Sequence, residues 1–257
     1  MLKIDPQKEE KKIVQFIKKT LKDQGFKKSI LALSGGVDSS TTLLLLTKAL
    51  GAKNVLVTEL PYGKQNMTDA YQMIKLAQIP AKNVFEINIK PVVQKLTKTI
   101  HQFTNSPIHQ LRLGNIMTRV RMILIYDLAK SHQVLVCGTE NKSEYLLGYF
   151  TLYGDQASDF EPIRHLYKTQ VIQLAKYLGV PKKIIKKPPT AGLWPDQTDE
   201  KELGFSYQEA DPILYLKYDK KLDVGQIVKK GFEKKLVQKV LKQVEKNAFK
   251  HQLPYHL

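Results

Sequence analysis

Hydrophobic residues recur at two alternating spacings along most of the chain. Residues 8–24 place Ile13 and Ile17 four positions apart within a polar background, which predicts an amphipathic helix. The next segment, 29–33, is a short continuous apolar run, which is typical of a buried strand. The same patterns predict strands at 54–60, 84–89 and 133–137 and helices at 43–50, 68–78, 92–103, 115–130, 166–178, 207–217 and 232–248.

Strands that alternate with helices predict a parallel sheet, because each crossover helix must return the chain to the same edge of the sheet. The strands are mostly apolar, as strands buried on both faces are. The expected fold class is therefore α/β, with a doubly wound and mostly parallel sheet flanked by helices. No linker divides the chain, so residues 1–257 are expected to form one domain. Two loops, 150–164 and 186–206, are long enough to suggest function.

The composition is that of a globular protein with one unusual feature. Of 257 residues, 42% are hydrophobic and 25% are charged, which excludes a disordered or collagen-like chain. The net charge of +17 would suit a partner such as nucleic acid or a membrane. Nucleic-acid readers rely on arginine, however, and only four of the 41 basic residues are arginines: Arg112, Arg119, Arg121 and Arg164. The charge therefore indicates a lysine-rich surface, and no specific nucleic acid or membrane partner is expected.

Cys137 is the only cysteine, which excludes an internal disulfide and a Cys-x-x-Cys site. It lies in the apolar run 134–137, which predicts a buried thiol. No apolar run approaches the ~18 residues of a membrane-spanning helix. Residues 1–6 lack the apolar core of a signal peptide. These features predict a cytoplasmic protein.

The strongest local pattern is the segment 34–40, Ser-Gly-Gly-Val-Asp-Ser-Ser, between a predicted strand and a predicted helix. Its glycines let the backbone turn tightly, and the helix behind it offers free N–H groups to a phosphate. Asp38 would repel a bare phosphate, so its presence predicts a hard cation such as Mg²⁺ between the two. An ordinary capped turn is the alternative. The full pattern between strand and helix favours the phosphate site.

This segment resembles the PP-loop of the ATP pyrophosphatases and lacks the Gly-Lys-Ser/Thr of a Walker A loop. Those enzymes cleave ATP between the α- and β-phosphates and activate a substrate oxygen as an adenylate. Further segments resemble one family within that group, the NAD synthetases. They are 114–122, 138–155, 166–170 and 187–194. The resemblance runs from about residue 10 to the C-terminus and implies a Rossmann-like fold.

The resemblance implies that ATP, deamido-NAD and ammonia react to give NAD, AMP and pyrophosphate. Adenylation turns a poor acyl donor, the nicotinate carboxylate, into one that ammonia can attack. About thirty residues precede the PP-loop, and Cys137 lies in a predicted strand. We therefore expect the short, ammonia-dependent kind of enzyme, without a glutaminase domain. The family also implies a homodimer with its active site near the interface.

The resemblance also assigns roles to individual residues. Asp38 and Glu144 match Mg²⁺ ligands, and Asp38, Asp159 and Lys168 are the expected catalytic residues. Arg119, Asp159 and Lys250 match contacts to deamido-NAD, and Asp159 is expected to orient or deprotonate ammonium. The residues that match ATP contacts are Ala32, Leu33, Ser34, Gly35, Gly36, Val37, Asp38, Ser39, Thr139, Lys168 and Thr190.

The loop at 188–198 is expected to close over the adenylate and exclude water, because hydrolysis would waste ATP. The alternative is a rigid connector.

Three departures from the family pattern lie on the dinucleotide side. Leu152 stands where a lysine is usual, Gln156 and Ala157 replace a glycine pair, and Phe249 replaces a histidine. Another PP-loop ligase that adenylates a different carboxylate is therefore an alternative function. A basic nucleic-acid-binding protein on a PP-loop scaffold is a further one.

Overall fold

Four parallel strands form the sheet at the centre of the chain. The computed structural model describes all residues except 1, 105, 253–254 and 256–257. The strands are β1 (Ser29–Ala32), β2 (Val55–Glu59), β3 (Val84–Glu86) and β4 (Leu135–Cys137), in the order β3-β2-β1-β4. Because the chain order reverses next to β1, a crevice is expected at the carboxyl end of that strand.

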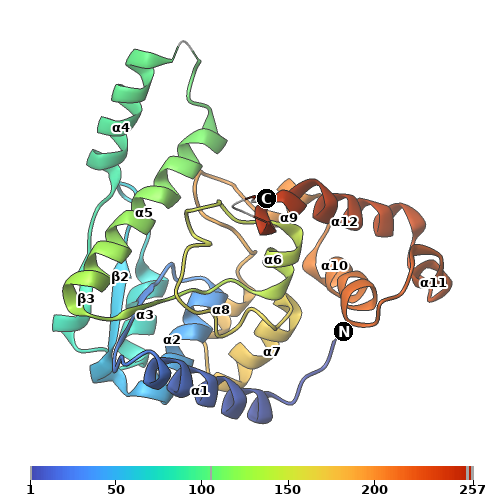
Figure 1. Cartoon of the computed structure of the whole chain (residues 1–257), viewed down its shortest axis with the longest axis horizontal. Helices are drawn as coiled ribbons and strands as arrows, with labels where there is room; N and C mark the ends of the chain where they lie inside the picture. Colours follow the sequence, from blue (N-terminus) through green and yellow to red (C-terminus); the bar gives the residue numbers. More distant parts are fainter. Residues whose placement is uncertain (1, 105, 253–254, 256–257) are drawn as a thin grey trace.

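Helices lie on both faces of this sheet, and two groups of helices extend away from it (Figure 1). Figure 1 shows α4 and α5 rising together at one end, while α10, α11 and α12 lie at the other. The helices are α1 (Pro6–Asp23), α2 (Val37–Leu50), α3 (Thr68–Leu76), α4 (Lys90–Phe103), α5 (Gln110–His132), α6 (Lys142–Leu147), α7 (Lys168–Leu178), α8 (Lys182–Lys186), α9 (Asp199–Leu203), α10 (Tyr207–Leu214), α11 (Val224–Lys229) and α12 (Lys234–Asn247).

Alternate residues of the strands feed two cores, as the period of a strand requires. Leu31 and Val57 pack into the core formed by α1, α2 and α7. Ile30 and Leu56 face the opposite side and pack against Ile125 of α5. Both faces of the sheet are therefore buried, and the short strands need no polar face. Cys137 is buried within the first core, as its sequence context predicts.

A third core joins the C-terminal helices to the elements that carry the site. It is built from buried residues of α10, α11 and α12 and also includes Leu147 of α6 and Tyr167, the residue before α7. The C-terminal helices therefore support the end of α6 and the start of α7. None of the helices in the described part of the chain combines the length and apolar character needed to cross a bilayer.

The predicted fold class is confirmed, and most elements lie where the periodicity places them. The main boundary error is at α2, which begins at Val37 rather than at 43. Its first turns carry Ser39, Ser40, Thr41 and Thr42, which are buried although polar and therefore hide the helical pattern. The short helices α6, α8, α9 and α11 were not predicted, because two turns or fewer give no readable period.

One glycine shows how closely α12 packs on α6. Gly148 ends α6 with φ +62°, and a Cβ there would lie 2.3 Å from Cβ of Asn247. Gly25 also has a positive φ, +75°, but its Cβ would meet nothing within 4 Å. The two positions therefore share backbone strain but differ in crowding.

We expect Gly25→Ala to lower the free energy of unfolding by about 1 kcal/mol, from backbone strain alone. Gly148→Ala should lower it by about 2–4 kcal/mol, because overpacking against Asn247 adds to the same strain. Urea unfolding followed by circular dichroism measures both values. Equal losses in the two variants would contradict the close packing of α12 on α6.

Candidate active site

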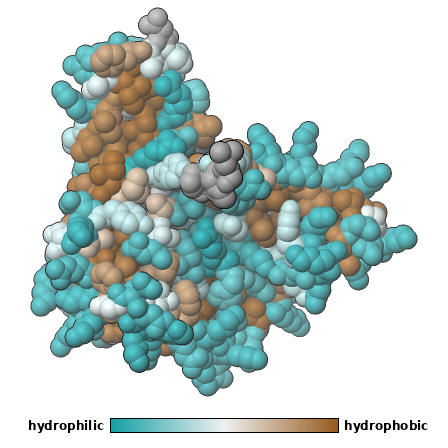
Figure 2. Space-filling view, in the orientation of Figure 1, coloured by the Kyte–Doolittle hydropathy of each residue, from teal (hydrophilic) through white to brown (hydrophobic). Residues whose placement is uncertain are grey.

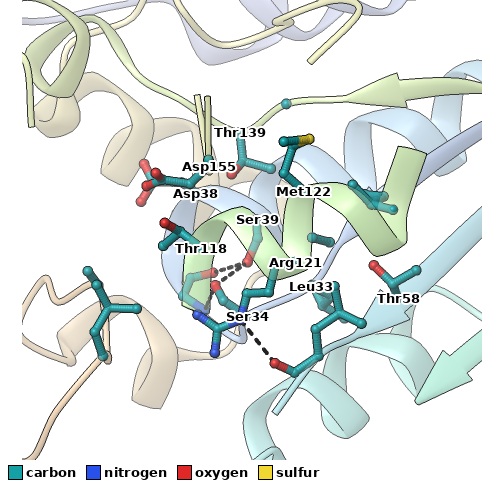
Figure 3. Close-up of a pocket in the computed structure, with 18 of the residues that line it drawn as sticks. Leu33, Ser34, Asp38, Ser39, Thr58, Thr118, Arg121, Met122, Thr139 and Asp155 are labelled. Atoms are coloured by element: carbon teal, nitrogen blue, oxygen red, sulfur yellow. Dashed lines mark hydrogen bonds between the residues drawn. The ribbon is translucent and has the colours of Figure 1, made fainter. Parts of the chain in front are cut away.

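The PP-loop joins the carboxyl end of β1 to the first turn of α2. Gly35 has φ +77°, and a Cβ there would meet the Ala70 backbone nitrogen at 3.0 Å, so the loop needs glycine at this point. The hydroxyls of Ser34 and Ser39 lie 3.0 Å apart (Figure 3). The first turn of α2 presents backbone N–H groups to the same space, which suits the oxygens of a phosphate.

Two carboxylates and one ammonium group meet beside this loop. The Lys168 Nζ donates hydrogen bonds to Asp38 Oδ2 at 2.5 Å and to Glu144 Oε1 at 3.0 Å. The three side chains come from the first turns of α7, α2 and α6. The Lys168 side chain is 4% exposed, so this is a nearly dry ion cluster. The structure thus brings together the two residues expected to hold Mg²⁺ and the lysine expected to bind ATP.

Buried hydrogen bonds fix the elements that carry this cluster. Asn141 caps α6 and also donates to Asp38 Oδ1 at 3.0 Å. The Asp211 carboxylate, on α10, accepts from the Ser143 hydroxyl at 2.6 Å and from the Thr169 backbone N–H at 2.8 Å. Asp211 is fully buried and therefore holds the starts of α6 and α7 in register. This explains why the C-terminal helices matter to the site.

Burial and charge act against each other in this cluster. Burial alone would lower the pKa of Lys168, but the carboxylates of Asp38, Glu144 and Asp199 raise it, so the lysine is charged at neutral pH. Burial raises the pKa of Glu144, and the charges of Asp38 and Asp199 act in the same direction. The single ammonium group therefore leaves this site with more carboxylates than cations.

A cavity of about 260 Å³ extends from the PP-loop over the ends of β1, β2 and β4. Of the predicted ATP-binding residues, those that line it are Ala32, Leu33, Ser34, Gly36, Asp38, Ser39, Thr139, Lys168 and Thr190, together with Glu144. Among the described residues, Gly35 and Val37 belong to the loop but do not line the cavity. Gly35 shapes the turn, and Val37 is buried in the first core.

The loop at 188–198 lies over this cavity and is held at several points. Leu193 and Trp194 pack against Gly114 of α5, where a Cβ would meet Leu193 Cδ1 at 3.0 Å. The Gln65 amide donates to the Gly192 carbonyl at 3.4 Å. At the start of the loop, Lys187 Nζ donates to Asp69 Oδ2 at 3.1 Å, beside the PP-loop. These contacts are few and mostly polar, as in a segment that can open.

Arg121 connects the same loop to α5 from inside the cavity. Its Nε donates to the Leu60 carbonyl at 3.0 Å, and its NH2 donates to Gln65 Oε1 at 3.1 Å. Because the Gln65 amide also donates to the Gly192 carbonyl, the Arg121 guanidinium stabilises the observed position of the loop through the Gln65 side chain.

The three residues predicted to bind deamido-NAD surround the cavity without lining it. The Arg119 Nε donates to the Leu152 carbonyl at 3.2 Å, and Lys250 Nζ donates to the carbonyls of Gly148 and Phe150 at 2.6 and 2.7 Å. Both therefore hold the loop that follows α6. Asp159 lies at the end of β4.

The Asp159 carboxylate is already engaged in hydrogen bonds. It accepts from the Val136 N–H at 2.7 Å and from the Tyr126 hydroxyl at 3.3 Å. In the described part of the chain, Asp159 is therefore a structural acceptor. Its role toward ammonium stays a prediction.

Several lining residues were not predicted from the sequence. Arg121 lies in the family-like segment 114–122, but the resemblance assigned it no role. Gln65 carries no local signal that separates it from solvated polar residues. Asp199 follows the helix-capping Thr198, so on sequence grounds it reads as an ordinary acid in a first helical turn. Its burial in the structure, with only 3% of the residue exposed, shows that Asp199 is not an ordinary solvated acid.

A parallel sheet with a PP-loop at its switch point, a carboxylate pair and a buried lysine defines an ATP-binding α/β protein of the PP-loop kind. Comparison with known proteins narrows this class. The family model for NAD synthase matches residues 9–254. The chain belongs to the NAD synthase family.

Individual relatives agree with this assignment. An NH(3)-dependent NAD(+) synthetase from Pyrococcus horikoshii is 42% identical over 95% of this chain and 93% of the relative. One from Chlorobaculum tepidum is 38% identical over 94% of this chain and 86% of the relative.

Two solved structures are similar over nearly the whole chain. NMN synthetase from Francisella tularensis has a TM-score of 0.86 and 31% identity, and covers 99% of both chains. NH3-dependent NAD synthetase from Campylobacter jejuni has a TM-score of 0.81 and 31% identity, and covers 99% of this chain and all of the other.

Proposed function

We propose that this chain is an ammonia-dependent NAD synthetase that works as one synthetase domain. It amidates the nicotinate carboxyl of deamido-NAD with ammonia and converts ATP to AMP and pyrophosphate. The observation that carries the proposal is the meeting of Asp38, Glu144 and Lys168 beside the PP-loop of a chain in this family.

The first step needs a phosphate site that stabilises a departing pyrophosphate. The hydroxyls of Ser34 and Ser39 and the N–H groups at the start of α2 offer donors to phosphate oxygens. Lys168 adds a charged donor close to the same place. Charge that develops on the leaving pyrophosphate is therefore met by fixed donors, which require little reorganisation during the reaction.

The residues also fit a divalent cation. The Lys168 ammonium already stands as a cation between the Asp38 and Glu144 carboxylates, so the pair accepts positive charge at this point. Two carboxylates and phosphate oxygens are the hard ligands that Mg²⁺ prefers, and we propose Asp38 and Glu144 as its protein ligands. When bound, Mg²⁺ would neutralise phosphate charge.

The second step needs protection from water, because an adenylate hydrolyses. The 188–198 loop covers the cavity and is held by Gln65 and by the packing of Leu193 on Gly114. Closed, it would exclude water while ammonia attacks the activated carboxyl. Arg119, Lys250 and Asp159 are proposed to contribute on the acceptor side, around the loop after α6.

We also propose that the protein is a homodimer that pairs through α4 and α5. Large apolar side chains are exposed along these two helices, and Figure 2 shows them as one hydrophobic strip. A contiguous apolar patch exposed on a globular protein is typical of an interface. The exposed residues are Val92, Leu96, Phe103, Leu111 and Ile123. Arg119 lies one helical turn before Ile123 on α5, so the proposed interface would lie beside the proposed acceptor side of the site.

A second candidate acceptor is a nicotinate mononucleotide. The similar structure from Francisella tularensis is an NMN synthetase. In this chain, Leu152 replaces the lysine usual in the loop after α6, and its carbonyl already binds Arg119. A chain with fewer cationic contacts to the second nucleotide of a dinucleotide would lose less binding free energy when it accepts the smaller substrate.

The central assignment predicts that Asp38→Asn lowers the rate of AMP formation by at least about 100-fold, because the metal and phosphate site loses a charge. AMP release with ATP, Mg²⁺, deamido-NAD and ammonia measures this. Asp23→Asn, an exposed change in α1, should leave the rate unchanged. A fully active Asp38→Asn enzyme would exclude the PP-loop chemistry.

The two acceptors are separated by kcat/KM for deamido-NAD and nicotinate mononucleotide in the same assay. We expect deamido-NAD to be preferred, and Leu152→Lys to lower its KM about tenfold by adding one charged hydrogen bond. Tyr153→Lys adds the same charge at an exposed neighbour and serves as the control. A preference for the mononucleotide in the unaltered enzyme would establish the second candidate instead.

The dimer predicts that Ile123→Asp shifts the sedimentation coefficient to that of a monomer, because a buried, unpaired carboxylate opposes association. Leu76→Asp changes an equally exposed apolar residue on α3, outside the strip, and should leave the dimer intact. Dimers that persist in Ile123→Asp would place the interface elsewhere.

A further inference from the structure

Asp199, which directly follows the 188–198 loop, is a buried carboxylate that has no role in the proposed reaction. Asp199 is 3% exposed and lines the same cavity as Asp38, Glu144 and Lys168. Its Oδ2 accepts a hydrogen bond from the Tyr207 hydroxyl at 3.0 Å. Its Oδ1 is buried and accepts no hydrogen bond within the described part of the chain. The Tyr149 hydroxyl also faces this carboxylate, but its one proton is donated to Glu202 Oε2 at 3.1 Å. A buried carboxylate oxygen without a hydrogen bond destabilises the folded protein unless a donor reaches it.

Lys168 is a charged donor whose ammonium acts on the Asp199 carboxylate. Its Nζ lies 5.3 Å from the centre of the Tyr207 ring, and the hydroxyl of that same ring binds Asp199. Asp199 also helps to raise the pKa of Lys168, after Asp38 and Glu144. Tyr207 is fixed in the C-terminal core, so it holds Asp199 and Lys168 in a set relation.

The ion cluster poses a physical problem for metal binding. The Lys168 ammonium occupies the position between Asp38 and Glu144 where we propose that Mg²⁺ binds. Two cations cannot share that position, so Mg²⁺ must displace the ammonium. In a site this buried, the displaced ammonium needs counter-charge at its new position, from the ATP phosphates and from a carboxylate within reach.

We propose that Asp199 is the positioning residue that receives the Lys168 ammonium when Mg²⁺ and ATP take over Asp38 and Glu144. Its free Oδ1 then gains the donor that it lacks, and the lysine stays charged beside the phosphates. Lys168 thus alternates between the two metal carboxylates and Asp199.

This arrangement also links metal binding to loop closure. The Asp199 N–H donates to the Pro189 carbonyl at 3.0 Å, so the residue is part of the closed loop. An open loop would withdraw the acceptor from Lys168, and the lysine would compete with Mg²⁺ for the two carboxylates. Tight metal binding therefore requires the closed loop. The inference rests on the metal and ATP part of the proposed function and not on the identity of the acceptor.

The test measures metal affinity without turnover. Mn²⁺ replaces Mg²⁺ as a paramagnetic probe, and binding is followed by electron paramagnetic resonance in the presence of α,β-methylene-ATP. We expect Asp199→Asn, which keeps the shape and the contact to Tyr207, to weaken Mn²⁺ binding about tenfold. Glu200→Gln, an exposed change one residue away, should have no effect. Unchanged Mn²⁺ affinity in Asp199→Asn would overturn the proposal.

A double-variant cycle separates positioning from direct metal ligation. In a Lys168→Met background, Asp199→Asn should cause no further loss, because no ammonium remains to be received. An equal tenfold loss in that background would make Asp199 a ligand of the metal and contradict its role through Lys168. Tyr207→Phe keeps the ring but removes the hydrogen bond to Asp199, and it should also weaken Mn²⁺ binding. This variant tests the proposal if Asp199→Asn does not fold.

No acceptor or ammonia is present in these measurements. A wild-type enzyme that fails to amidate deamido-NAD would reject the proposed function. The Mn²⁺ result would still decide the role of Asp199.

Discussion

The buried ion cluster of Lys168 with Asp38 and Glu144 is the constraint on which the arrangement of this molecule depends. A charged amine that is almost removed from water is stable only if its counter-charges are held at hydrogen-bonding distance. Here they come from the first turns of three helices that are far apart in the chain. Asn141 and Asp211 hold those turns in place. The C-terminal helices therefore contribute to the chemistry although they lie away from the sheet.

The two halves of the site differ in how completely one chain builds them. On the nucleotide side, the PP-loop, the ion cluster and the closing loop line a single cavity. On the proposed acceptor side, Arg119 and Lys250 donate hydrogen bonds to backbone carbonyls of the loop after α6. Of the departures from the family pattern, Leu152, Gln156 and Ala157 follow α6, and Phe249 lies beside Lys250. These departures leave the PP-loop and the ion cluster unchanged.

Structural features that depend on neighbouring residues in the chain could be predicted from the sequence, and features that depend on distant residues could not. The strands and long helices were predicted because burial repeats at a fixed spacing within a few residues. The start of α2 was missed because Ser39–Thr42 are polar but buried. Arg121 and Asp199 were missed for a related reason. Arg121 lies in a family-like segment and Asp199 follows a helix cap, but neither context shows that the charge is buried. Only their neighbours in space show that they are enclosed.

The sequence by itself determined the α/β fold class, the strand–loop–helix at 34–40 and the family to which the chain belongs, because these depend on residues that are adjacent or regularly spaced. Only the tertiary structure decided that Lys168 lies between Asp38 and Glu144 and that Gln65 holds the 188–198 loop. It also decided that Asp199 is buried in the wall of the same cavity. The reason is that charge and burial act through space. Residues 38, 144, 168 and 199 become one site only when the sheet and the C-terminal core bring them together.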